Sequence, residues 1–240
     1  MTDRKGPARA EGDAGGDARA ELVALAARGV SWAGYTALVP TTAARGRPAA
    51  VLVLFGVLDA APAQRRGTAV PPALDVLLVG RASTLTHHSG QIAFPGGRLD
   101  PDDAGPAAAA IREAVEETGL DATGVEVLGT LGELPVPVSD HQVTPVLAWW
   151  SRPSPVTVVD TAESATVFRA PVADLLDPAH RRTAVVGGRS GPRTGPAFLV
   201  GPHLVWGFTA IVLDTLFDQL GWTEPWDRGR TIDAPIEPRR

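Results

Sequence analysis

Residues 95–120 read PGGRLDPDDAGPAAAAIREAVEETGL, and this stretch constrains the fold more than any other part of the chain. Pro106 suits the first turn of a helix, the alanines that follow have high helix propensity, and Gly119 stands where a C-terminal cap is expected. The stretch therefore predicts a helix over residues 106–119, with strands on either side of it.

Three glutamates on this helix fall at i, i+3 and i+4, so their carboxylates share an arc of about 100°. They are Glu113, Glu116 and Glu117. On an isolated helix the like-charged pair Glu113 and Glu117 costs roughly a few tenths of a kcal/mol. A hard divalent cation offsets that repulsion, because Mg²⁺ binds one or two carboxylates together with waters and substrate phosphate oxygens. Taken alone, three glutamates more often form a solvated acidic face that looks outward while the apolar side packs.

The segment before the helix favours the metal interpretation. It reads GQIAFPGGRLDPDD over residues 90–103, where a strand is expected to end at Phe94 and the turn from Pro95 to Gly97 leads toward the helix. Glycines let backbone groups approach a metal ion or a phosphate closely. A Pro-Gly-Gly run by itself is an ordinary turn. Loop and helix together are far more specific.

Composition limits the kinds of function. The 22 basic and 27 acidic residues give a net charge of −5, which provides no general field for a nucleic acid. The chain has no cysteine, so disulfides, thiolate zinc sites and cysteine nucleophiles are excluded. No apolar run approaches the roughly 20 residues that cross a bilayer, and the charged start lacks the apolar core of a signal peptide. A cytoplasmic protein is expected.

The chain is predicted to hold one domain over residues 21–221, preceded by a disordered lead at 1–20 and followed by an irregular tail at 222–240. Strands are predicted at 51–59, 74–80, 125–131, 143–150 and 165–170, and further helices at 21–30, 172–176 and 206–220. This order indicates an α+β fold in which helices cover a mixed sheet.

PGG followed by RExxEExG, with fifteen residues from Gly97 to Arg112, resembles the Nudix box over Gly97–Leu120. The resemblance implies a Nudix-like α/β/α sandwich with a mixed β-sheet. The box is one residue longer than usual, and Asp103 occupies roughly the place of its first glutamate. That departure is characteristic of one branch, the coenzyme A diphosphatases.

Three segments outside the box resemble the same branch. They are LLVGRASTLTHHSGQIAFPGG (77–97), HQVTPVLAW (141–149) and VWGFTA (205–210). The resemblance therefore spans roughly residues 45–220.

The resemblance implies a role for each side chain of the site. Glu113 and Glu117 would bind Mg²⁺ or Mn²⁺ directly, and Glu116 would be either a further metal ligand or the catalytic base that activates water. Arg112 would pair with Glu116 and fix its rotamer, although such a surface pair is usually worth little. The residues expected to bind the substrate are Arg81, His88, Gln91, Gly96 and Gly97. Of the adjacent pair His87 and His88, one is expected to point away, because neighbours on a strand face opposite sides.

The implied reaction is hydrolysis of the diphosphate of coenzyme A or acyl-CoA to 3',5'-ADP and a 4'-phosphopantetheine product. The alternatives are a Nudix hydrolase of ADP-ribose or another nucleoside diphosphate derivative, and a non-catalytic domain that senses a nucleotide. The intact set of three glutamates disfavours the sensor. The expected partner is a small nucleotide, with no nucleic acid and no membrane, and a homodimer is left open.

Overall fold

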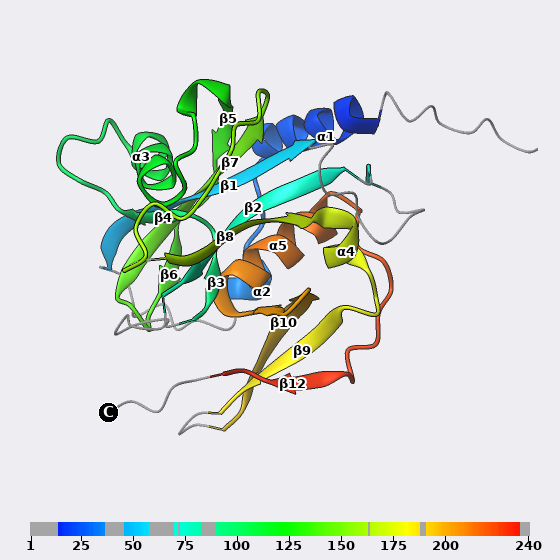
Figure 1. Ribbon diagram of the computed structural model, residues 1–240. Helices are drawn as coiled ribbons and strands as arrows, with labels where there is room; N and C mark the ends of the chain where they lie inside the picture. The colour runs from blue at the N-terminus through cyan, green and yellow to red at the C-terminus, as the bar shows by residue number, and fades with distance from the viewer. Residues whose placement is uncertain are drawn as a thin grey trace, which may run out of the picture.

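The computed structural model is dominated by a mixed sheet with a smaller sheet beside it (Figure 1). The residues that the structure describes are 14–36, 46–57, 70–71, 73–82, 90–162, 164–187 and 191–235. No helix within these ranges is long and apolar enough to cross a membrane.

Eight strands of the described chain form the large sheet. They are β1 Arg47–Val57, β2 Leu74–Arg81, β3 Ile92–Ala93, β4 Gly96–Arg98, β5 Val125–Thr130, β6 Leu134–Val136, β7 His141–Trp150 and β8 Ser164–Pro171. The main path runs β3-β2-β1-β7-β5, while β4 pairs with β1, β6 with β7 and β8 with β2. The central pair β1 and β7 is parallel and the other pairs are antiparallel, so the sheet is mixed, as predicted.

Helices cover both faces of the large sheet. They are α1 Ala14–Arg28, α2 Ala33–Thr36, α3 Pro106–Thr118, α4 Val172–Leu176 and α5 Gly207–Gln219, with a 3₁₀ turn at Ala122–Gly124. Alternate β1 residues point to opposite faces. Val53 and Phe55 pack in a core cluster with α1 and α5, whereas Leu52 and Leu54 pack in a second cluster with α3. This arrangement confirms the predicted α/β/α sandwich.

The predicted helix over residues 106–119 is confirmed as α3. Gly119 adopts a left-handed conformation with φ of 67°, and its N–H donates to the carbonyl of Val115 at 2.9 Å. This is the glycine cap expected from the sequence. The five predicted strands and the helices at 172–176 and 206–220 are also present, within a few residues of their predicted ends.

The N-terminal boundary was predicted too late in the chain. Helix α1 begins at Ala14, so the second part of the expected disordered lead is helical; residues 1–13 lie outside the described chain. Ala18, Leu22 and Leu25 are all buried and follow the helical spacing of four and three residues. A buried alanine contributes no strong hydrophobic signal, which is why composition alone missed this turn of helix.

The C-terminal tail is irregular over residues 222–230, but the prediction missed a short strand and the packing of the tail on the domain. Trp222 is buried, and its indole N–H donates to Glu21 at 2.6 Å. Further along, β12 Thr231–Asp233 pairs in parallel with β9 Arg181–Val186. The folded domain therefore reaches at least to Asp233, while residues 236–240 lie outside the described chain.

The small sheet was not predicted at all. Its order is β11-β10-β9-β12, with β10 at Arg193–Val200 and β11 at His203–Val205. Helix α5 lies between this sheet and the large one (Figure 1), and Phe198 of β10 packs edge-on against Phe217 of α5. Arg181, which is buried, stacks on Phe198 and on Trp226 with centroid distances of 4.3 and 4.6 Å. An arginine that packs as a core residue gives no apolar signal in the sequence.

One buried carboxyl lies within the large sheet. Asp75 of β2 is 1% exposed, and within the described chain neither of its oxygens has a hydrogen-bond partner. Burial raises the pKa of Asp75 to about 7; nearby Arg169 opposes this shift and Asp174 adds to it. The raised pKa makes the stability of the fold depend on pH.

We expect Asp75→Asn to raise the free energy of unfolding by about 2 kcal/mol above neutral pH. The unfolded carboxyl ionises near pH 3.8 and the folded one near pH 7, so the wild type loses stability as the pH rises between these values. The neutral amide removes that loss, and the gain should be smallest near about pH 4. Urea unfolding across this range measures it. Exposed Asp233→Asn is the control, and a gain independent of pH would contradict the assignment.

Candidate active site

Helix α3 lies close to the sheet because its inner face is built from small residues. Ala109, Ala110 and Ala114 are fully buried against β1 and β7. Thr118 is buried as well, and its hydroxyl donates to the carbonyl of Ala114 at 2.6 Å. A helix packed this tightly holds its side chains in fixed positions relative to the strands and to the loop beside it.

Two of the three glutamates, Glu113 and Glu117, contact the turn that leads into β4. The N–H of Gly96 donates to Oε2 of Glu117 at 3.1 Å. A Cβ placed on Gly97 would lie 2.3 Å from Oε1 of Glu113, so any other residue there would displace that carboxylate from its present position. Gly96 has φ of 155°, and its own Cβ would meet the carbonyl oxygen of Ala50 at 2.3 Å. The two glycines thus let the loop close over the acidic side of α3.

The expectation that the acidic face looks outward is wrong for two of the three glutamates. Glu117 is 7% exposed, and the side chain of Glu113 is 19% exposed. Of the three, only the side chain of Glu116, at 58%, is largely in solvent, while Val115, on the apolar side of the helix, is exposed. Helical spacing gave the shared arc correctly, but it carried no information about the loop that covers part of that arc.

Arg112 is the centre of an ionic network. Its Nε and Nη2 donate to the two carboxylate oxygens of Asp103 at 3.2 and 3.0 Å. Its Nη1 donates to Glu113 and to Glu116, both at 3.1 Å. Nη2 also donates to the carbonyl of Arg98 at 3.0 Å, so one guanidinium ties the loop to the helix. The predicted Arg112–Glu116 pair is confirmed, but it is one contact among several.

The two-bond contact with Asp103 changes the electrostatics of both groups. The hydrogen bonds from Arg112 lower the pKa of Asp103, and the same contact raises the pKa of Arg112. Asp103 therefore stays ionised and anchors the arginine, which explains why an acidic residue stands at this place in the motif. Sequence reasoning noted the position but missed its partner.

The site keeps an excess of negative charge. One guanidinium faces Asp103, Glu113 and Glu116, and Glu117 lies beside them on the loop. Within the described chain no three histidine or carboxylate side chains converge as a complete ligand set. Mg²⁺ needs no such set, because water and substrate phosphate supply most of its oxygens. Hard oxygen donors beside a glycine loop therefore fit a divalent cation.

Two of the predicted substrate-binding residues meet at the strand ends beside the loop. The N–H of Arg81, at the end of β2, donates to the carbonyl of Gln91 at 3.0 Å. In the described chain the buried Nε of Arg81 has no hydrogen-bond partner, which suits a group that meets an anion. His88 and its neighbour His87 lie outside the described residues. Phe94 is buried in the core.

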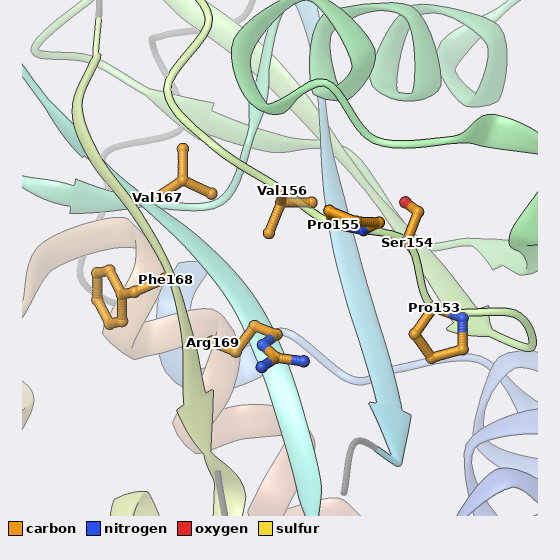
Figure 2. Close-up of a pocket in the computed structure, with 7 residues that line it drawn as sticks. All are labelled: Pro153, Ser154, Pro155, Val156, Val167, Phe168 and Arg169. Atoms are coloured by element: carbon orange, nitrogen blue, oxygen red, sulfur yellow. The ribbon is translucent and has the colours of Figure 1, made fainter. Parts of the chain in front are cut away.

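An open groove of about 430 Å³ lies on the sheet beside α3 (Figure 2), and the sequence gave no sign of it. It is lined by Pro153, Ser154, Pro155, Val156, Val167, Phe168 and Arg169. One wall continues into residues 157–159, which bind the end of α3. Thr157 donates to the carbonyl of Thr118 at 3.0 Å and Val159 to that of Glu117 at 3.4 Å. The groove exposes both polar and apolar surface, and it is attached to the helix that carries the carboxylates.

A glycine loop that gathers carboxylates around one arginine has the donor types that fit a divalent cation and the anionic group that such a cation binds. The NUDIX domain family matches residues 63–185, which include this loop and helix. The chain belongs to the Nudix hydrolase family, and it is a hydrolase of diphosphate bonds. Members of this family generally use divalent metal ions.

Two relatives in sequence support this assignment, NUDT8 and NudL. The human mitochondrial coenzyme A diphosphatase NUDT8 is 37% identical over 180 residues, which is 72% of this chain and 70% of the relative. An uncharacterized Nudix hydrolase, NudL, of Cronobacter sakazakii is 35% identical over 175 residues, covering 73% of this chain and 83% of the relative. A MutT/nudix family protein from Enterococcus faecalis aligns over 85% of this chain and 74% of its own, with 16% identity and a TM-score of 0.47.

Proposed function

We propose that the protein hydrolyses the diphosphate bond of coenzyme A or of acyl-CoA and releases 3',5'-ADP and 4'-phosphopantetheine or its acyl derivative. The observation that carries the proposal is the collection of Glu113 and Glu117 at the Gly96–Gly97 turn. The similarity to a coenzyme A diphosphatase and the branch-like segments around the box support the choice of substrate.

Glu113 and Glu117 would hold the metal ion, Mg²⁺ or Mn²⁺. Both carboxylates reach the same turn, where the N–H of Gly96 donates to Glu117. The ion would neutralise charge on the diphosphate and lower the pKa of the attacking water. Glu116 is the most exposed of the three glutamates, and Arg112 fixes one of its oxygens, so it is placed to accept a proton or to add a ligand.

The reaction needs no covalent intermediate. Water attacks one phosphorus of the diphosphate, and the bond from that phosphorus to the bridging oxygen breaks. The proton of the water passes to a carboxylate, for which Glu116 is our candidate, and the bridging oxygen leaves with the other phosphate. Arg112 holds Glu113 and Glu116 in place during this step. Arg81, His88, Gln91 and the glycine turn would hold the phosphate oxygens.

Product analysis by mass spectrometry tests the proposal. The protein is incubated with coenzyme A, ADP-ribose or a dinucleotide, in Mg²⁺ or Mn²⁺ and in a chelator. We expect 3',5'-ADP and 4'-phosphopantetheine from coenzyme A only when metal is present. Faster cleavage of ADP-ribose or the dinucleotide would assign another substrate within the family. If no substrate is turned over, a nucleotide-sensing role replaces the proposed one.

A further inference from the structure

Two arginines and a histidine gather at the end of the large sheet that carries the β4 turn. This cationic cluster consists of Arg47, Arg98 and His141, at the ends of β1, β4 and β7. In the register of the sheet, Arg47 of β1 lies opposite His141 of β7, and Arg98 of β4 lies opposite Ala49 of β1. Paired residues share a face of the sheet, and so do residues two apart on one strand. All three side chains therefore start from the same face.

The cluster and the carboxylates start from opposite faces of the same short strand. Gly97, which borders Glu113, pairs with Ala50, and Ala50 packs in the cluster that contains α3. Arg98 is the next residue, so its side chain starts from the other face. Its carbonyl nevertheless accepts a hydrogen bond from Arg112 at 3.0 Å. One residue thus connects the cationic cluster to the centre of the ionic network.

The backbone that supports the cluster is tightly constrained. A Cβ on Gly46 would lie 2.6 Å from the carbonyl carbon of His141, so the starts of β1 and β7 are in close contact. The N–H of Arg47 donates to the carbonyl of Asp140 at 2.9 Å, and its guanidinium donates to that of Ser139 at 3.3 Å. Fixed backbones reduce the conformational entropy that a bound anion must overcome.

Positive charge dominates this corner. Burial lowers the pKa of His141, and the charges of Arg47 and Arg98 lower it further, against a weaker opposing effect of Asp140. Among the described residues Arg98 has no carboxylate in ion-pair contact with its guanidinium, and both arginines are exposed. Two accessible arginines beside a histidine provide the planar and charged donors that a phosphate monoester prefers.

We propose that the cationic cluster binds a phosphate monoester on the ribose of the substrate, while the diphosphate is held on the other face of the turn. The inference rests on the proposed function, since coenzyme A carries both a diphosphate and a ribose 3'-phosphate. The ribose 3'-phosphate is the group that distinguishes this substrate from nucleoside diphosphate derivatives without a phosphate on the ribose. The cluster selects the nucleotide half of the substrate and takes no part in bond cleavage.

Calorimetric titration of the intact protein with 3',5'-ADP and with 5'-AMP tests the inference. We expect 3',5'-ADP to bind at least about tenfold more tightly, because it offers the extra charge-assisted contacts. Arg98→Gln and Arg47→Gln should each remove most of that preference. Arg152→Gln is the matched control, since Arg152 is an exposed arginine that follows β7 at the opposite end of the strand and donates to the carbonyl of Thr123.

Equal affinity for the two nucleotides would overturn the inference, and so would a preference that survives both substitutions. This binding test is separable from the proposed function. Failure to cleave coenzyme A would remove the reaction but leave a measured preference for 3',5'-ADP intact. Conversely, cleavage of coenzyme A without such a preference would retain the reaction and reject the cluster as its phosphate site.

Discussion

Replacing Glu116 with glutamine is expected to lower kcat by about 10²–10⁴-fold, the usual contribution of a general base. The amide cannot accept the proton of the attacking water, yet it keeps the shape of the side chain. Because Glu116 is largely exposed, its loss should leave the circular dichroism spectrum and the thermal midpoint nearly unchanged. Steady-state kinetics with the substrate identified by product analysis provides the measurement.

A metal titration separates the two roles considered for Glu116. If it is the base, the metal concentration for half-maximal rate should match the wild type even though kcat falls. A large rise in that concentration identifies a metal ligand instead. Glu133→Gln removes an exposed carboxylate that makes no ion pair with Arg112, and it is the control. Near-native turnover of Glu116→Gln would remove this residue from the catalytic assignment.

Gly97→Ala is the second substitution for which we expect a large effect. The added Cβ would lie 2.3–2.6 Å from three carboxyl atoms of Glu113, so either the side chain or the turn must move. Because the contacted atoms are the end of a flexible side chain, we expect Glu113 to be displaced, with a marked loss of metal affinity and a destabilisation no greater than about 1 kcal/mol, the lower end for overpacking. Urea unfolding and metal-dependent kinetics measure the two effects separately.

Gly187→Ala is the matched control, because a Cβ there has no heavy atom within 4 Å and the residue does not need a left-handed conformation. It should leave stability and turnover close to wild type. Should Gly97→Ala retain wild-type metal affinity, the close approach of Glu113 to the turn would have no catalytic meaning. Loss of metal affinity at little cost in stability would show that Glu113 moved while the turn stayed in place.

The parts of the fold that were predicted from sequence have strong local patterns. Helix α3 was predicted from its proline, its alanines and Gly119, and strands such as β1 and β7 from long apolar runs. The small sheet escaped notice because β9 and β10 each begin with arginine and threonine, and their apolar residues are confined to the last half of the strand. Arg181 of β9 stacks on aromatic residues distant in sequence, and no local pattern encodes these contacts.

In the candidate site, too, the features set by local sequence were predicted and the contacts made by the loop were not. The spacing of the three glutamates and the pairing of Arg112 with Glu116 follow from helical geometry and were predicted. The bond from Gly96 to Glu117, the anchoring of Arg112 by Asp103 and the close contact at Gly97 all depend on where a loop folds over the helix. Such contacts are set by tertiary packing, so composition and periodicity carry no signal for them.

The parallel pairing of β1 with β7 has a consequence for how the protein is made. Arg47 and His141 are neighbours in the sheet but lie 94 residues apart in the chain. Pairings of such separation form slowly, because the intervening loop must first be closed. During synthesis the glycine turn and α3 emerge before β7, so the residues of the ionic network exist before the central strand that supports them. We therefore expect the catalytic centre to mature only after Trp150 has left the ribosome.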